Sequence, residues 1–327
     1  MIISVILIIV GFALLIKGAD FLVDGASSIA QKFHIPEIII GLTVVSIGTS
    51  MPELVVSVNS ALQGHSDIAV GNVIGSNIAN VMLILGMCAV MKPLEFKRET
   101  RIIEIPITIA ATVMLFIMSN TAHAGIDNMI GRAEGGILLG CCILFIIYNI
   151  VMAKKGEAFD AEEGLDEREV EITILPNWKA VLFIIVGIIG LKFGGDLVVE
   201  HAVNIATLCG ISETLISLTI VAISTSLPEL VTSVTATRKG EIDMAIGNIV
   251  GSNIFNIVLI IGTSALISPI LYDISYNTDM LVSLVSVILL AITPYIGHKN
   301  HLGRIQGGLY VSSYLAYMIW LVCTNVM

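Results

Sequence analysis

The chain has 327 residues, of which 56% are hydrophobic and only 13% are charged. Soluble domains usually carry about 25% charged residues, so this composition and a mean hydropathy of +0.96 exclude a soluble enzyme or a disordered protein and indicate an integral membrane protein. The net charge of −10 gives no sign of nucleic-acid binding. The five cysteines lie in or beside apolar runs without metal-ligand spacing, and we expect them to be reduced packing residues.

Ten apolar segments are long enough to cross a membrane, which takes roughly 20 apolar residues per helix. In chain order they cover residues 2–24, 36–61, 67–91, 102–119, 132–152, 179–200, 212–237, 243–268, 279–297 and 305–325. The first lacks the Lys/Arg-rich start of a signal peptide, so we expect it to be retained. The predicted fold is an all-α integral membrane protein with ten transmembrane helices in two groups of five, residues 1–152 and 179–327.

An acidic linker at residues 153–178 separates the two groups of helices. It contains Asp160, Glu162, Glu163, Asp166, Glu167, Glu169 and Glu171. This charge favours a solvated linker. A regulatory calcium-binding loop is an alternative, although the D-x-D-x-D-G order of a compact calcium loop is missing.

The positions of Lys and Arg predict how the chain is oriented in the membrane. If the N-terminus faces outward, thirteen of these residues fall in inward-facing loops and Arg132 alone falls in an outward-facing loop, while Lys17 and Lys192 lie within spans. Cytoplasmic loops are enriched in Lys and Arg. Both termini are therefore expected outside, and the acidic linker is expected in the cytoplasm.

An internal repeat is the most informative feature of the sequence. Residues 41–86 match residues 217–262 at a constant offset of 176 without a gap, and 25 of the 46 positions are identical. Each half holds five predicted spans, an odd number, so the second copy should enter the membrane from the opposite side. Secondary transporters use such inverted repeats, with the substrate site near the midplane where the repeats meet. A duplicated scaffold would preserve apolar packing, but it would not need the same Glu, Asn, Ser and Thr in both copies.

Each copy carries an acidic residue deep in an apolar span, Glu53 in GTSMPE and Glu229 in STSLPE. A charge there costs several kcal/mol, from roughly 2.5 to 17, so a positive partner is needed. The sequence places no Lys or Arg within a helical turn of either residue, which favours a mobile cation. A structural ion pair or a permanently protonated pair of glutamates remains the alternative.

The residues around each glutamate strengthen the cation interpretation. Pro52 and Pro228 should open the helix over Thr49-Ser50 and Thr225-Ser226, which frees carbonyl oxygens that can bind a cation. The next span of each copy contains GNVIGSNIAN or GNIVGSNIFN, whose glycines allow close helix approach. That approach can bring more oxygen ligands against the glutamates, from Ser76, Asn80, Ser252 and Asn256. Carboxylate, hydroxyl, amide and carbonyl oxygens suit hard cations such as Ca²⁺ and Na⁺, whereas zinc and copper prefer nitrogen and sulfur.

The paired motifs GTSMPE with GNVIGSN, and STSLPE with GNIVGSN, resemble the two alpha-repeats of the sodium/calcium exchanger family within the cation/calcium exchangers. The resemblance implies Na⁺-driven Ca²⁺ antiport by alternating access in a multi-pass protein of a prokaryotic plasma (inner) membrane. It implies no cofactor and no obligatory protein partner beyond the lipid bilayer and the two transported ions. The family's ligands carry over to the matching positions Ser46, Thr49, Ser50, Glu53, Ser76, Asn80, Ala222, Thr225, Ser226, Glu229, Ser252 and Asn256.

Two positions depart from the family pattern. Ser224 stands where the family usually has Gly, which affects the local backbone geometry, and Asn256 stands where many relatives, including the potassium-dependent branch, have Asp. The missing charge argues against a potassium requirement. The linker is also far too short for the large regulatory domain of animal exchangers.

Three other functions remain open on sequence grounds. A proton-coupled Ca²⁺/H⁺ exchanger is the main alternative, because glutamates could exchange Ca²⁺ for H⁺, but protons have no use for so many hydroxyl and carbonyl oxygens. A cation channel would conduct without countertransport. A membrane enzyme is disfavoured because no span presents a nucleophile and base or a metal-ligand set.

Overall fold

The computed structural model describes residues 1–121, 128–163, 175–210, 224–296 and 300–326. Within these ranges, eight helices are long and apolar enough to cross a membrane, and a bent helix pair at Glu37–Thr49 and Met51–Leu62 can form a ninth span. The predicted span at 212–237 begins in residues 211–223, which lie outside the described ranges. The described part of the chain is a multi-pass helical membrane protein.

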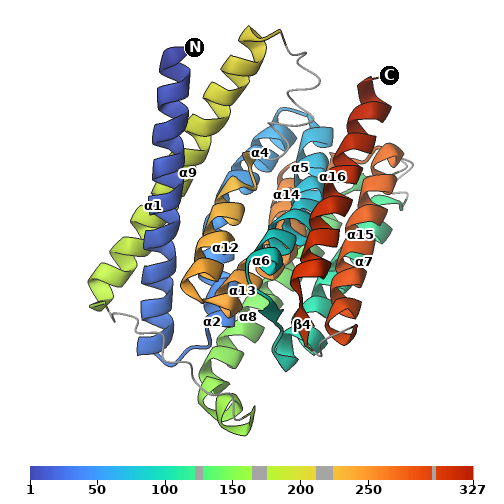
Figure 1. Ribbon diagram of the computed structural model, residues 1–327. Coiled ribbons are helices and arrows are strands. Elements are labelled where there is room, and N and C mark those ends of the chain that lie inside the picture. The colour runs from blue at the N-terminus through green and yellow to red at the C-terminus, as the bar shows by residue number, and fades with distance from the viewer. Residues whose placement is uncertain (122–127, 164–174, 211–223, 297–299, 327) are drawn as a thin grey trace. The chain divides into compact units, whose positions relative to one another are not determined.

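The elements of the first half follow the order of the predicted spans (Figure 1). They are α1 Ile2–Lys32, α2 Glu37–Ile40, η1 Gly41–Val45, α3 Ser46–Thr49, α4 Met51–Leu62, α5 Ser66–Ile78, η2 Ala79–Leu85, α6 Gly86–Met91, β1 Leu94–Glu95, η3 Thr100–Glu104, α7 Ile105–Ser119, β2 Met129–Ile130 and α8 Arg132–Glu163. The segments η1, η2 and η3 are π-helical.

The second half continues with a similar succession of elements. They are α9 Asn177–Leu208, α12 Leu227–Lys239, α13 Ile242–Phe255, π-helical η5 Asn256–Ile261, α14 Gly262–Ile267, β3 Ile270–Leu271, 3₁₀-helical η6 Ile274–Tyr276, α15 Asn277–Ile292, 3₁₀-helical η7 Thr293–Tyr295, β4 His301–Leu302 and α16 Arg304–Val326. The short strands pair antiparallel, β1 with β4 and β2 with β3.

The chain forms two compact units, and each takes segments from both halves of the sequence. Unit 1 comprises residues 1–49, 146–248 and 315–327, and unit 2 comprises residues 50–145 and 249–314. Two of the boundaries fall inside the repeated motifs, between Thr49 and Ser50 and between Asn248 and Ile249.

In unit 1, the long helices α1 and α9 pack against each other along small residues. A Cβ added to Gly18 would lie 2.8 Å from the Leu191 backbone nitrogen, and one added to Gly194 would lie 2.7 Å from the Gly11 carbonyl oxygen. Such distances leave no room for a side chain, so glycine is required for this approach. The contacts repeat every seven residues, with Gly11 against Gly194, Gly18 against Gly187 and Gly25 against Ala180.

Unit 2 also contains contacts that only glycine permits. A Cβ on Gly307 of α16 would lie 2.7 Å from the Gly86 carbonyl oxygen at the start of α6, and one on Gly135 of α8 would lie 2.7 Å from the Leu266 backbone nitrogen of α14. The aromatic rings of Phe145 and Phe255 pack edge to face with centroids 5.6 Å apart. Backbone approach and ring packing together hold these helices close.

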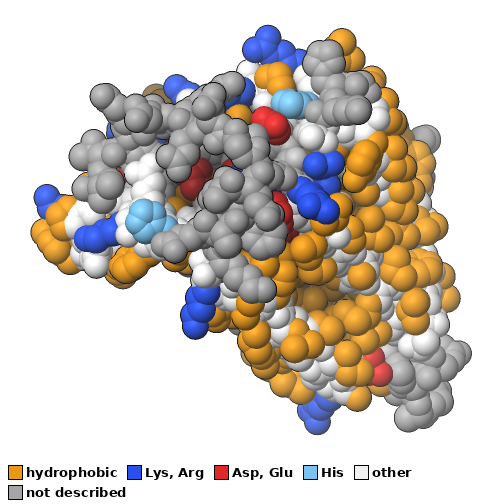
Figure 2. Space-filling model, turned by 90° about the horizontal axis from the view of Figure 1, so that it is seen from below, with side chains coloured by type: hydrophobic (Ala, Val, Ile, Leu, Met, Phe, Trp, Pro, Cys, Tyr) orange, Lys and Arg blue, Asp and Glu red, His pale blue; other side chains and the backbone are white. Residues whose placement is uncertain are grey.

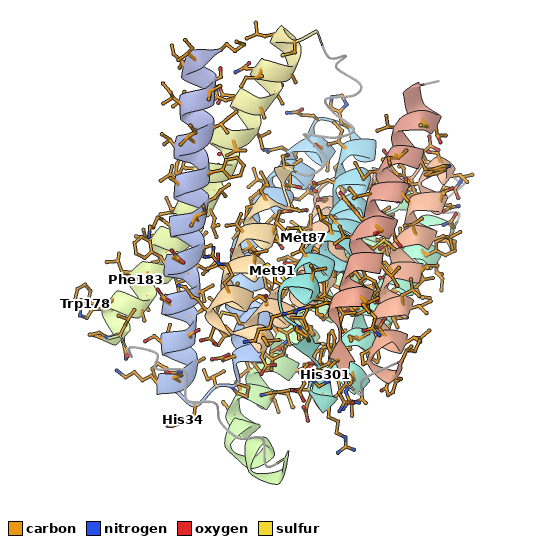
Figure 3. The ribbon with its side chains drawn as sticks, in the orientation of Figure 1. His34, Met87, Met91, Trp178, Phe183 and His301 are labelled. Carbon is orange, nitrogen blue, oxygen red and sulfur yellow. The ribbon has the colours of Figure 1, made fainter. Side chains whose placement is uncertain are left out.

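The surface has the character expected of a protein in lipid. Large hydrophobic side chains are exposed along α1, α8, α9 and α16, and Figure 2 shows hydrophobic side chains over broad areas of one face. Trp178 projects outward at the start of α9 (Figure 3). The ring of Phe183 on the same helix lies tilted against that of Phe21 of α1, with centroids 4.8 Å apart. The five cysteines, all among the described residues, form no disulfide; Cys88 and Cys142 are buried, but Cys209 and Cys323 are exposed and do not pack inside the protein.

Candidate functional site

The helix of the first repeat copy is broken at the predicted position, and the second copy has a turn at the equivalent residues Thr225 and Ser226. Helix α3 ends at Thr49 and α4 begins at Met51, so the helix is interrupted at Ser50. Ser50 has φ −84° and ψ 8°, and its repeat equivalent Ser226, directly before α12, has φ −84° and ψ 3°. A proline follows two residues later in both copies. The break predicted from Pro52 is confirmed at Ser50, although Thr49 remains in α3. In the second copy the turn at Thr225 and Ser226 agrees with the prediction from Pro228, and residues 211–223, before Ser224, lie outside the described ranges.

The two glutamates occupy equivalent places in the two copies. Glu53 lies in the first turn of α4 in unit 2, and Glu229 lies in the first turn of α12 in unit 1. Both are buried, with 0% and 1% of their surface exposed. A helix N-terminus carries a partial positive charge, which lowers the cost of each carboxylate without providing a full counter-charge.

In unit 2, side chains from both copies of the repeat meet. The Ser50 hydroxyl donates to the Ser252 hydroxyl oxygen at 3.0 Å. On α5, the Asn72 Nδ2 donates to the Ser57 hydroxyl oxygen at 3.0 Å and to the Glu53 main-chain oxygen at 3.3 Å. Asn72 therefore ties α5 to the helix turn that carries Glu53.

In unit 1, an equivalent amide supports the other copy. The Asn248 Nδ2 donates to the Ser233 hydroxyl oxygen at 2.9 Å, which repeats the Asn72–Ser57 bond at the offset of 176. Asn248 Oδ1 accepts from the Thr49 hydroxyl at 3.0 Å. The Thr49 hydroxyl also lies 3.3 Å from the Ser46 main-chain oxygen. The bond to Asn248 orients Thr49 at the end of α3.

Four buried asparagines of unit 2 form a reciprocal set. The Asn80 Nδ2 donates to Asn253 Oδ1, and the Asn256 Nδ2 donates to Asn77 Oδ1, both at 3.0 Å. Asn80 and Asn256 stand at the second and first positions of π-helices η2 and η5. Within the described ranges, the Oδ1 atoms of Asn80 and Asn256 have no hydrogen-bond partner. Because a buried carbonyl oxygen is costly to leave unpaired, these two oxygens are candidate ion ligands.

The predicted site residues fall into two groups. Unit 2 holds Ser50, Glu53, Ser76, Asn80, Ser252 and Asn256, and all six are buried. Unit 1 holds Ser46, Thr49, Ser226 and Glu229, which are buried, and Thr225, which is partly exposed. Ala222 lies outside the described residues.

Close approach at the glycines of the second motif is confirmed in one copy. A Cβ on Gly247 would lie 2.5 Å from the Ile38 carbonyl oxygen in unit 1. In the other copy, a Cβ on Gly75 meets no described atom within 4 Å, and one on Gly71 meets Tyr276 at 3.4 Å. The segment equivalent to the one around Ile38 falls in residues 211–223, outside the described ranges.

Sequence reasoning missed the asparagines that support the predicted ligands. These are Asn72 and Asn77 in the first copy and their equivalents Asn248 and Asn253 in the second. The signal was present, because each is identical in both copies and lies in the same GN-x-x-GSN motif as the predicted ligands. The π-helices that begin near Asn80 and Asn256 were also missed, although such turns are frequent at functional sites.

The fold and these buried groups define a multi-pass helical membrane protein with a duplicated set of carboxylate, hydroxyl and amide groups. The sequence model of the family described as sodium/calcium exchanger protein matches residues 3–151 and 179–323. The matched segments include most of the chain. The chain belongs to this family.

Individual relatives agree with this assignment. The chain is 37% identical to the inner membrane protein YrbG of Escherichia coli over 297 residues, covering 88% of this chain and 89% of the relative. It is 29% identical to the sodium/calcium exchanger MaX1 of Methanosarcina acetivorans over an alignment of 346 positions, covering 97% and 98%. A solved structure of the sodium-calcium exchanger NCX_Mj matches with a TM-score of 0.80 at 29% identity and covers 98% of both chains.

Proposed function

We propose that the protein is a secondary-active antiporter that exchanges Na⁺ for Ca²⁺ across a prokaryotic plasma membrane. One observation carries the proposal: both copies of the repeat bury a glutamate in the first turn of a helix, in a chain of the sodium/calcium exchanger family. The similar NCX_Mj is described as a sodium-calcium exchanger and was soaked with Na⁺ and Ca²⁺. The ions are substrates, and the protein needs no cofactor or obligatory protein partner.

The proposed topology is ten transmembrane helices in two inverted repeats, residues 1–152 and 179–327, joined by the cytoplasmic linker 153–178. Both termini face outside. The thirteen Lys and Arg residues on the inward side support this orientation. The reciprocal bonds between repeat-equivalent asparagines support a local two-fold relation between the copies.

The proposed ion ligands are the twelve residues expected from the sequence. Glu53 and Glu229 supply the charge, and two carboxylates match one divalent ion. Hydroxyl oxygens and the carbonyl oxygens freed at the broken helices complete the coordination of Ca²⁺ or several Na⁺. The buried Oδ1 atoms of Asn80 and Asn256 add two neutral acceptors.

The proposed mechanism is alternating access controlled by charge. Without ions, the two carboxylates carry about two negative charges, and enclosing them away from water costs too much free energy. Bound Ca²⁺ or Na⁺ neutralises them and makes the closed state accessible. Because only loaded carriers cross, the protein exchanges ions rather than leaking them.

Uptake of ⁴⁵Ca²⁺ into proteoliposomes tests the proposal. Vesicles loaded with Na⁺ should accumulate Ca²⁺ when Na⁺ flows outward, and vesicles without Na⁺ should not. Uptake driven equally well by a proton gradient in sodium-free vesicles would instead identify a Ca²⁺/H⁺ exchanger. Unitary currents without countertransport would identify a channel.

A further inference from the structure

The four asparagines of unit 2 are linked by more than two side-chain bonds. Besides the bonds that hold Asn80 and Asn256, the Asn77 Nδ2 donates to the Asn253 main-chain oxygen at 3.2 Å, and the Asn253 Nδ2 donates to the Asn77 main-chain oxygen at 3.4 Å. All four side chains are at most 2% exposed. Each bond has its counterpart at the offset of 176.

The two main-chain oxygens determine the orientation of all four amides. A main-chain oxygen only accepts hydrogen bonds, so the Nδ2 of Asn77 must face Asn253, which places Asn77 Oδ1 toward Asn256. Asn256 must then present its Nδ2 to that oxygen, so its own Oδ1 points away from Asn77. The same reasoning, starting from Asn253, shows that the Oδ1 of Asn80 points away from Asn253.

We infer that Asn77 and Asn253 are positioning residues, which hold Asn256 and Asn80 with their carbonyl oxygens, rather than their NH₂ groups, directed to the transported cation. The inference rests on the proposed function, since it assigns a role to the support of the same ion site. A reversed amide would present hydrogen-bond donors, which repel a cation. Neutral oxygens fixed in advance also bind without an ordering cost at the moment of ion entry.

A purely structural role makes a different prediction from a positioning role. If Asn77 only joins α5 to α13, its loss lowers the stability of the ion-free protein and leaves ion affinity unchanged. If it fixes the amide of Asn256, its loss weakens ion binding, and the effect depends on which side chain stands at 256. Two measurements therefore distinguish the roles. A structural role lowers the midpoint of thermal unfolding without ions, whereas a positioning role raises the Ca²⁺ concentration that gives half-maximal stabilisation or transport.

The test uses the full-length protein in detergent with Ca²⁺ as the probe, and reads Ca²⁺-dependent thermal stabilisation together with half-saturation of transport. Asn77→Leu keeps the size of the side chain and removes both of its bonds. We expect the half-saturating Ca²⁺ concentration to rise about tenfold, which corresponds to about 1.4 kcal/mol. Asn77→Ser serves the same purpose if the leucine variant does not fold. Asn120→Leu is the matched control, because Asn120 makes a reciprocal amide pair with Asn277 at 2.9 Å at the end of α7, and its loss should leave this concentration unchanged.

A second substitution makes the test specific. In an Asn256→Asp background both ends of the side chain are oxygens, so orientation no longer matters and Asn77→Leu should raise half-saturation by less than about threefold. In an Asn80→Asp background, Asn77→Leu should still raise the half-saturating Ca²⁺ concentration about tenfold, because Asn80 is held by Asn253 and not by Asn77. The positioning role is overturned if Asn77→Leu raises the half-saturating Ca²⁺ concentration equally in the unmodified, Asn256→Asp and Asn80→Asp proteins. It is also overturned if Asn77→Leu leaves this concentration unchanged in the unmodified protein. Failure of Na⁺-driven uptake by the unmodified protein overturns the proposed function instead, while Ca²⁺ binding still decides the role of Asn77.

Discussion

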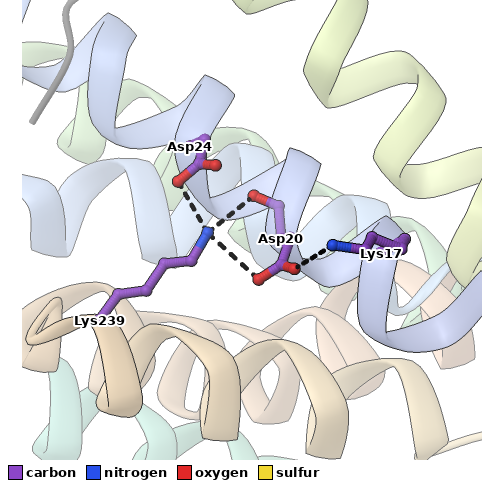
Figure 4. A network of polar contacts seen from close by, with 4 residues as sticks. All are labelled: Lys17, Asp20, Asp24 and Lys239. Carbon is purple, nitrogen blue, oxygen red and sulfur yellow. Dashed lines mark hydrogen bonds and ion pairs between the residues drawn. The ribbon is translucent and has the colours of Figure 1, made fainter. Parts of the chain in front are cut away.

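Lys239, the last residue of α12, places its ammonium 2.7 Å from an Asp24 carboxylate oxygen of α1. The same ammonium lies 3.3 Å from Asp20, which also contacts Lys17 (Figure 4). The repeat equivalents of the two aspartates, Asp196 and Glu200, are also acidic, but Gln63 is the equivalent of Lys239. The sequence therefore supports this ion-pair network in one copy of the repeat only.

Lys239→Gln should weaken the attachment of α1 to α12. Because the side chains are 29% to 49% exposed, we expect a loss of about 0.2–1 kcal/mol in unfolding free energy, which disappears at high salt. Thermal unfolding in detergent at low and high salt measures it. Lys192→Gln is the control, since Lys192 pairs with Asp196 within α9 alone and links no second helix. A salt-independent loss would contradict the electrostatic explanation.

Gly18→Ala should disrupt the packing of α1 on α9. The new Cβ would lie 2.8 Å from the Leu191 nitrogen and 2.9 Å from the Gly187 oxygen, and backbone atoms move aside only if the helices separate. The free energy of unfolding should fall by about 1–3 kcal/mol, which a lower unfolding temperature would show. Gly136→Ala in α8 meets no described atom within 4 Å and should be neutral or stabilising by up to about 1 kcal/mol. Equal behaviour of the two variants would argue against tight packing at Gly18.

Glu53→Gln or Glu229→Gln should abolish calcium transport and leave a folded protein. Each substitution removes one of the two proposed site charges while keeping the buried shape. Uptake of ⁴⁵Ca²⁺ at matched expression measures the effect, and Glu95→Gln, at a carboxylate that is 56% exposed, is the control. Normal uptake by either glutamine variant would remove that glutamate from the site.

Exchange should not require potassium. Asn256 is neutral at the position where many members of the resembled family, including its potassium-dependent branch, have Asp, so the proposed site has no third carboxylate. Na⁺-driven Ca²⁺ flux should be the same after K⁺ is replaced by a large organic cation. The Asn256→Asp variant shows whether an added charge changes ion preference. A steep loss of flux in the unmodified protein on K⁺ removal would refute the role given to Asn256.

Transport should respond to membrane potential. In the proposed site, Ca²⁺ would cancel the charge of Glu53 and Glu229, whereas more than two Na⁺ would leave the loaded site positive. Each net charge contributes about 2.3 kcal/mol per 100 mV, so an interior-negative potential should speed Na⁺ entry and Ca²⁺ exit. Flux measured in vesicles clamped with valinomycin and K⁺ tests this. Indifference to potential would indicate two Na⁺ per Ca²⁺, or protons in place of Na⁺.

The helix breaks and the buried glutamates are the parts of the site that local sequence predicts well. Pro52 and Pro228 remove a backbone donor and clash with the preceding turn, so the positions of Ser50 and Ser226 follow from neighbours in the chain. The burial of Glu53 and Glu229 follows from the apolar spans around them. Each prediction needs only a few consecutive residues.

Contacts between helices were not predicted to the same extent. Spacing shows that Asn77 and Asn80 share a helix face, but it does not show that this face meets Asn253 and Asn256. The glycine contacts between α1 and α9 were missed for the same reason, because glycines seven residues apart give no sign of their partner helix. These features depend on how helices far apart in the chain are rotated against each other.

The seven-residue spacing of the glycine contacts limits how α1 and α9 can move. A helix rises 1.5 Å per residue, so the next register that again places glycine against backbone is displaced by about 10.5 Å. Smaller displacements would press larger side chains, such as that of Leu15, into space that only glycine fits. The two helices therefore keep their register and move as one rigid body. Since α1 begins the first half of the chain and α9 begins the second, a displacement of α1 along its axis carries α9 with it.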